Sequence, residues 1–151
     1  LATSGKGAEA GAKVVLMSRA LLYQTRNDDE AAFVLAHELS HLVLDHQKQR
    51  KAAGRSRKVI LETEREADRL ALWLMANAGY DAATAPGFLR RRGAKGLAAL
   101  FQEPHHDRAE VRAKAVELEL AALGSTPIDS AHLRDWRGRF ILPESDWHKR
   151  P

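Results

Sequence analysis

Two histidines and a glutamate form the pattern in this sequence with the clearest chemical meaning. His37, Glu38 and His41 interrupt a mostly apolar segment, residues 31–44. Residues four apart project from one face of an α-helix, so the two imidazoles can converge on one ion at about 2.0–2.1 Å. Glu38 lies about 100° round from His37, where it can accept a proton from a water on that ion. This His-Glu-x-x-His arrangement predicts a zinc centre that activates water for hydrolysis.

The segment is apolar almost all round the helix, so His37, Glu38 and His41 are expected to be buried with it. A buried carboxylate and two buried imidazoles without partners are energetically costly, and a bound cation would offset that cost. The chain has no cysteine, so a transition-metal site must use imidazole and carboxylate ligands. The simpler alternative is a pair of buried histidines held by hydrogen bonds.

A catalytic zinc ion needs a third protein ligand that leaves one position open. His46 follows His41 by five residues, roughly 140° round the same helix, so we expect a surface histidine near the helix end. The spacing with a further histidine six residues after the second is absent, because position 47 is Gln47. Its companion glycine is also absent, since position 44 is Leu44. The class of zinc proteases that takes its third ligand from such a histidine is therefore disfavoured.

The next helical segment carries four acidic residues, which the helical period divides between two faces. The face that we expect to be solvated alternates in charge and holds Glu62, Arg65, Glu66 and Arg69. The other face is mostly apolar and holds Leu61, Glu64, Asp68, Ala71, Leu72 and Met75. Glu64 therefore points into the core as a candidate third ligand. Asp68, one turn later, can accept the outer N–H of a ligand imidazole, which we assign to His37. The alternative is that all four acids are solvated.

Helices must position these groups, and the sequence predicts them in order. Asn27 can cap a helix, with Glu30 in capping-box spacing, and that helix is predicted over about 28–51. Further helical segments are predicted over about 59–78, 81–101 with breaks near Pro86-Gly87 and Gly93, and 107–124. A short apolar run at 14–17 predicts one strand. The predicted fold class is mainly α, with an active-site helix, a Glu-bearing second helix and a short edge strand.

Length and composition fit one domain. The chain has 151 residues, of which 44% are hydrophobic, and a chain of this size can bury about two thirds of its surface without disulfides. We divide it into a flexible Gly/Ala-rich lead-in (1–12), the domain with the zinc centre (13–124) and a C-terminal tail (125–151). Trp136 and Trp147 are expected to pin that tail to the body. The sequence contains no run of about 18 apolar residues, so no membrane span is predicted.

The absence of cysteine and the charge pattern exclude several classes of protein. Without cysteine there is no disulfide, no Cys-based zinc finger, no iron–sulfur cluster and no thiol nucleophile. The net charge is +4, with basic clusters at 55–58, 90–92 and 134–139. These clusters lack the interleaved aromatic residues that stack bases, so we expect solvated loops and no nucleic-acid partner. Contact with an acidic lipid surface or nucleic acid is the alternative.

Two motifs together resemble a known family. The segment His37-Glu38-Leu39-Ser40-His41, followed by Glu64-Arg65-Glu66-Ala67-Asp68, looks like the gluzincin metallopeptidases. Within them it is similar to the family of the CAAX prenyl protease, the heat-shock protease HtpX, mitochondrial Oma-type proteases and the periplasmic protease-chaperone BepA. The similarity covers about residues 12–115. It implies a zincin-like metallopeptidase domain with one Zn²⁺ per chain on His37, His41 and Glu64. It also implies Glu38 as general base and peptides or unfolded proteins as substrates, in protein quality control.

The resemblance also implies a role for residues after these helices. Family members often carry a His-Pro with an arginine six residues beyond the histidine, and His106 and Arg112 have this spacing. His106 would then approach the zinc, to block it or to steady the reaction intermediate, with Arg112 nearby. Asp107 replaces the family's proline, however. The alternative is that His105 and His106 are turn residues before a helix cap.

The remaining expectations concern partners and other functions. In gluzincins a strand edge beside the zinc helix pairs with the substrate backbone, which implies that role for Val14, Val15 and Leu16. Packing under the helices is their alternative. A second function is a zinc-stabilised chaperone or protein-binding module with latent or no proteolysis, and a third is a nucleic-acid-associated regulator. By resemblance the compartment is the bacterial periplasm or cell envelope, with peripheral membrane contact, and the cytoplasm is the alternative.

Overall fold

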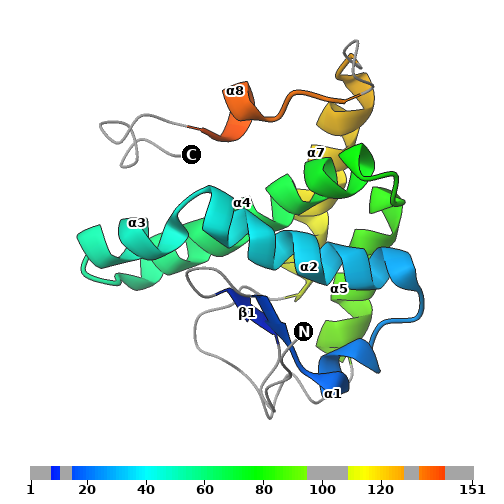
Figure 1. The fold of residues 1–151 in the computed structure, drawn as a ribbon, viewed down its shortest axis with the longest axis horizontal. Helices are drawn as coiled ribbons and strands as arrows, with labels where there is room; N and C mark the ends of the chain where they lie inside the picture. The colour runs from blue at the N-terminus through cyan, green and yellow to red at the C-terminus, as the bar shows by residue number, and fades with distance from the viewer. Residues whose placement is uncertain (1–7, 11–14, 95–108, 128–132, 142–151) are drawn as a thin grey trace.

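The computed structural model describes residues 8–10, 15–94, 109–127 and 133–141. These residues form a mainly α-helical fold, as the sequence predicted, with one pair of short strands (Figure 1). In chain order the elements are β1 (Ala8–Ala10), β2 (Val15–Met17), α1 (Arg19–Leu22), α2 (Asp28–Val43), α3 (His46–Ala52), α4 (Arg57–Asn77), the 3₁₀ turn η1 (Ala82–Thr84), α5 (Ala85–Ala94), α7 (Ala109–Ser125) and α8 (Arg137–Phe140).

Two long helices, α2 and α4, form the centre of the molecule. They lie side by side and run in opposite directions (Figure 1). The Asn27 side chain caps α2 by accepting a hydrogen bond of 3.0 Å from Glu30 N, which satisfies one of the first N–H groups of the helix. Both helices give buried apolar side chains to one core, among them Phe33, Val34, Ala36, Leu70, Ala71 and Leu72. The two elements that carry the candidate site are therefore fixed by core packing.

The predicted single helix over 28–51 is wrong, because the chain breaks between α2 and α3. Asp45 lies between them with a φ of 51°, in the left-handed region, where Asp and Asn are tolerated better than most residues. The Gln49 side chain, on α3, then donates a hydrogen bond of 2.6 Å to Leu44 O at the end of α2. The break turns α3 against α4 instead of letting it continue along α2 (Figure 1).

The strand pair lies against α2 at the opposite side from α8 (Figure 1). β1 and β2 are antiparallel, with Ala8 opposite Met17, Glu9 opposite Leu16 and Ala10 opposite Val15. Met17 is buried and joins the core. β1 falls within residues 1–12, for which the sequence predicted only a flexible lead-in, and Val14 lies outside the described residues.

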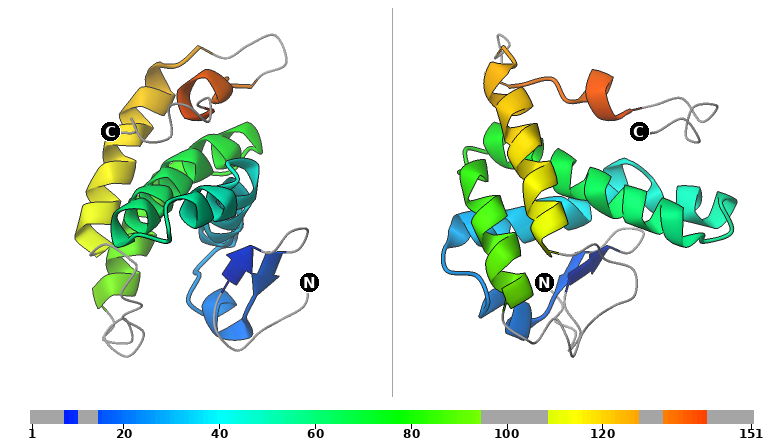
Figure 2. Two further views of the ribbon diagram at one scale, coloured as in Figure 1. Left: turned by 90° about the vertical axis from the view of Figure 1, so that its left-hand side faces the viewer. Right: turned by 180° about the vertical axis from the view of Figure 1, so that it is seen from behind.

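A second helical layer, α5 and α7, lies across the central pair. The two helices are side by side (Figure 2), and Arg90 on α5 pairs with both Glu110 and Glu117 on α7. Pro86 lies in the first turn of α5 and does not break a helix, because a proline there removes no intrahelical hydrogen bond. Gly93 also lies within α5, so the break predicted there is wrong too. The Asp81 side chain caps η1 by accepting from Ala83 N at 2.9 Å.

The described part of the C-terminal tail packs on α4 and α7. Phe140 is buried, and its ring meets Trp73 edge-on with centroids 6.2 Å apart. Arg139 pairs with Glu119 at 2.6 Å, and Trp136 packs partly buried against the core. Trp147, the other expected anchor, lies outside the described residues. Among the described helices, none is long and apolar enough to cross a membrane.

Candidate metal centre

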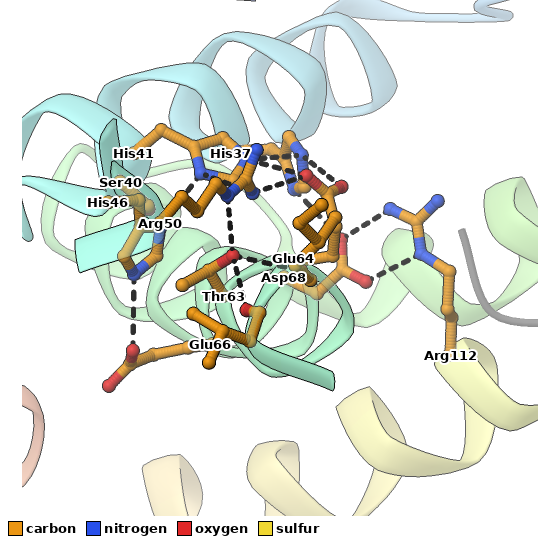
Figure 3. Close-up of polar contacts among 12 residues, drawn as sticks. His37, Ser40, His41, His46, Arg50, Thr63, Glu64, Glu66, Asp68 and Arg112 are labelled. Carbon is orange, nitrogen blue, oxygen red and sulfur yellow. Dashed lines mark hydrogen bonds and ion pairs between the residues drawn. The ribbon is translucent and has the colours of Figure 1, made fainter. Parts of the chain in front are cut away.

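Three side chains from the two central helices converge (Figure 3). The Nε2 atoms of His37 and His41 are 3.2 Å apart. Glu64 Oε2 lies 3.4 Å from His37 Nε2, and Glu64 Oε1 lies 3.3 Å from His41 Nε2. Neighbouring ligand atoms of a tetrahedral zinc ion, with bonds of about 2.0–2.1 Å, are roughly 3.3 Å apart. The donor set and its spacing therefore fit one zinc-sized ion.

Helical geometry explains why these three groups meet. His37 and His41 are one turn apart on α2, so both side chains project from the same face of the helix. Glu64 lies in the first half of α4, beside them, because α4 returns along α2 in the opposite direction. His37 and Glu64 are buried and His41 is partly buried. Little water competes for the donor atoms, which strengthens their electrostatic interactions.

Asp68 and Arg112 form the support behind His37. His37 Nδ1 lies 2.9 Å from Asp68 Oδ1, and Arg112 on α7 donates to both Asp68 oxygens at 2.7 Å each (Figure 3). Burial raises the pKa of Asp68, but the charge and hydrogen bonds of Arg112, with His37, outweigh it and hold the pKa at about 2. Burial lowers the pKa of His37, but hydrogen bonds and charges from Asp68 and Glu64 raise it to about 10. Asp68 is therefore an anion that accepts the His37 Nδ1–H.

Arg50 on α3 holds Glu64. It donates from Nη2 to Glu64 Oε1 and from Nε to Thr63 Oγ1, both at 2.7 Å. Burial lowers the pKa of His41, and this favours the neutral imidazole, the form that binds a metal. The centre therefore receives support from α3 as well as from α7.

Two residues of the site were assigned wrongly from the sequence. His46, expected at the surface, is 1% exposed, and Glu66, expected on a solvated face, is 5% exposed. His46 Nδ1 lies 2.7 Å from His41 Nδ1, and His46 Nε2 lies 3.1 Å from Glu66 Oε2. The error has one cause: α3 covers the face of α4 that a continuous helix over 28–51 would have left exposed. The signal that could have found it is the polar run from Asp45 onward, where the apolar pattern of α2 ends.

The structure places the other predicted site residues as follows. Glu38 is buried on α2, next to the candidate ligand His37. Arg112 lies on α7 and reaches the centre through Asp68. Val15 and Leu16 belong to β2, whereas His106 lies outside the described residues.

The comparison with known families identifies the class of protein. The Peptidase U49 family model matches residues 29–123, a stretch that contains the two candidate histidines, Glu38, Glu64, Asp68 and Arg112. The chain belongs to the Peptidase U49 family and is a peptidase by that membership. No curated protein and no solved structure matches it. The match supports a peptidase family and does not extend to the particular gluzincin family that the motifs resemble.

Proposed function

We propose that this peptidase is a zinc-dependent endopeptidase. The observation that carries the proposal is the cluster of His37 Nε2, His41 Nε2 and the Glu64 carboxylate: the two nitrogens are 3.2 Å apart, and each lies 3.3–3.4 Å from a different Glu64 oxygen. This spacing and this donor set suit a tetrahedral zinc ion with three protein ligands and one open position. Family membership supplies the substrate class, which is peptide bonds.

The residues divide the chemistry between them. When bound, zinc supplies a Lewis acid that makes a water acidic and polarises the scissile carbonyl. A carboxylate oxygen of Glu38 takes the proton of the attacking water and later gives it to the leaving amine, so proton and charge balance across the reaction. Asp68 accepts the Nδ1–H of His37, so that the ring can present its Nε2 lone pair to the ion once the Nε2 proton is displaced. Arg112 keeps Asp68 anionic, so its role in the proposal is positioning.

Two further roles rest on the resemblance. His106 is proposed to gate the centre or to steady the intermediate, and the β2 residues Val15 and Leu16 to pair with an extended substrate through their backbone. Their alternatives, a turn and core packing, remain the competing hypotheses. Peptides and unfolded proteins are the proposed substrates.

The test separates metal binding from hydrolysis. Metal content is measured for the purified parent, Glu38→Gln and Glu64→Ala, and each protein digests casein. We expect one zinc per chain in the parent and in Glu38→Gln, hydrolysis by the parent alone, and loss of zinc in Glu64→Ala. Stoichiometric zinc in Glu64→Ala would overturn the ligand assignment, and full activity of Glu38→Gln would overturn the base. Zinc and a zinc-dependent fold without cleavage by the parent would favour the binding-module alternative.

A further inference from the structure

His46 occupies a position between a candidate ligand and a carboxylate. It is the first residue of α3, with 1% of its surface exposed. One ring nitrogen lies 2.7 Å from His41 Nδ1 on α2, and the other lies 3.1 Å from Glu66 Oε2 on α4. Its ring meets that of His41 at an angle of 72°, with centroids 4.9 Å apart. His46 thus joins α2 to α4 immediately behind the centre (Figure 3).

The hydrogen positions along the hydrogen bonds from His41 to His46 to Glu66 can be assigned from the proposed zinc site outward. If His41 binds the ion through Nε2, its single hydrogen is on Nδ1, and it must donate to His46 Nδ1. The hydrogen of His46 is then on Nε2, where it donates to Glu66, since an ionised carboxylate only accepts. Arg50 Nη2 also lies 3.4 Å from His41 Nδ1, but its shorter contact of 2.7 Å is to Glu64 Oε1. One arrangement of hydrogens therefore satisfies all three side chains.

Each of the two candidate ligand histidines then donates a hydrogen bond from its Nδ1–H, but the acceptors differ. Asp68 accepts directly from His37 Nδ1. Glu66 lies two residues before Asp68 on α4 and is linked to His41 through His46. Ligand imidazoles usually donate their outer N–H to a carboxylate, a carbonyl or water, so an intervening imidazole is an unusual device.

We propose that His46 and Glu66 are positioning residues of the zinc centre: His46 fixes the ring orientation and tautomer of His41, and Glu66 acts on His41 through His46. This inference rests on the proposed zinc site. It adds to that site a second path of support, which comes from the α3 break at Asp45. Neither residue touches the reacting atoms.

The competing explanation is that His46 only fills space in the interior. The two explanations differ in what the variants do to zinc binding by the folded protein. His46→Asn can still present a side-chain oxygen near the position of Nδ1, whereas His46→Phe keeps a ring and removes both nitrogens. Glu66→Gln keeps size and removes the charge. Glu119→Gln is the matched control, because Glu119 is also buried and hydrogen-bonded to Trp73 and Arg139, away from the centre.

Zinc affinity is measured by competition with a chelator, with circular dichroism to establish that each variant is folded. We expect His46→Phe to bind zinc about 10–100-fold more weakly than the parent. His46→Asn should recover part of that loss, and Glu66→Gln should fall at the low end of that range. In the His46→Phe background, Glu66→Gln should add less than about a two-fold change, because the proposed effect of Glu66 on His41 passes through His46. Glu119→Gln should leave zinc affinity unchanged. The absorption spectrum of the Co²⁺-substituted protein should shift in His46→Phe and Glu66→Gln, less in His46→Asn, and not in Glu119→Gln.

The outcomes decide between the explanations. Parent-like zinc affinity and Co²⁺ spectrum in folded His46→Phe would overturn the inference, as would additive effects in the double variant. If His46→Phe fails to fold, Glu66→Gln and His46→Asn decide the question by the same two readouts. Failure of the proposed function looks different, because the parent itself would then bind no zinc.

Discussion

Arg112 on α7 donates a hydrogen bond of 2.7 Å to each carboxylate oxygen of Asp68 on α4. Only 1% of the Asp68 side chain and 13% of the Arg112 side chain are exposed. The pair connects the second helical layer to the candidate metal centre, since the same Asp68 accepts from His37. Arg112, expected from resemblance to lie near the zinc, therefore lies behind the candidate ligand His37 and contacts it through Asp68.

Arg112→Met should destabilise the protein and weaken zinc binding. It leaves the Asp68 charge buried without its cation, which costs about 3–5 kcal/mol in comparable buried pairs. Denaturant unfolding of the zinc-free protein measures this loss, and chelator competition measures the change in zinc affinity. Arg90→Met is the matched control, because Arg90 pairs with Glu110 and Glu117 at the surface and should change both quantities little. A parent-like unfolding curve for Arg112→Met would contradict the prediction.

Removal of zinc should lower the melting temperature of the parent. An ion that binds the folded state alone stabilises it by RT ln(1 + [L]/Kd), about 2.7 kcal/mol at 100 times Kd. Thermal unfolding is recorded with and without a chelator, and again after zinc is restored. His37→Ala is the control: its melting temperature should no longer depend on the chelator, since one of three ligands is missing. An unchanged melt in the parent would show that the ion contributes nothing to stability.

Asp45→Val should damage the centre from a distance. A β-branched residue in the left-handed region costs about 1–2 kcal/mol, and α3 with His46 and Arg50 depends on that turn. We expect lower stability and weaker zinc binding together. Asp45→Asn, which tolerates the same backbone conformation, should behave like the parent in both assays. If valine and asparagine gave equal stability and affinity, the turn would not position α3.

Phe140→Ala should destabilise the protein without affecting zinc. The ring is 1% exposed and packs edge-on against Trp73, and removal of a buried phenylalanine ring costs about 3–5 kcal/mol. Denaturant unfolding gives the stability, and tryptophan fluorescence reports the changed surroundings of Trp73. Ile141→Ala is the control, because Ile141 is largely exposed one residue further along. A loss of zinc affinity in Phe140→Ala would link the tail to the centre and contradict this prediction.

The sequence was most informative where local geometry decides the outcome. The four-residue spacing of His37 and His41 depends only on the period of a helix, and the apolar face of α4 carries Glu64 and Asp68 inward. The Asn27 cap and the helix over 57–77 are likewise local features. These elements follow from patterns within about ten residues of one another.

The features that escaped prediction depend on the rest of the fold. An aspartate can adopt a positive φ at small cost, but nothing next to Asp45 requires it to do so. The burial of His46 and Glu66 depends in turn on that break. β1 is three residues of Ala-Glu-Ala, a composition with low strand propensity, and it is a strand because β2 pairs with it.

The arrangement of α2, α3 and α4 also bears on how the protein folds. All three candidate ligands lie within residues 37–64, on one helical hairpin made of α2, α3 and α4. Bringing them together closes only a short loop of chain, and the entropy cost of closure grows slowly from a small value. Local contacts of this kind are associated with fast folding, because little loop entropy is lost before they form. The hairpin can therefore assemble its ligand set first, while Arg112 and the C-terminal tail dock onto a centre that is already shaped.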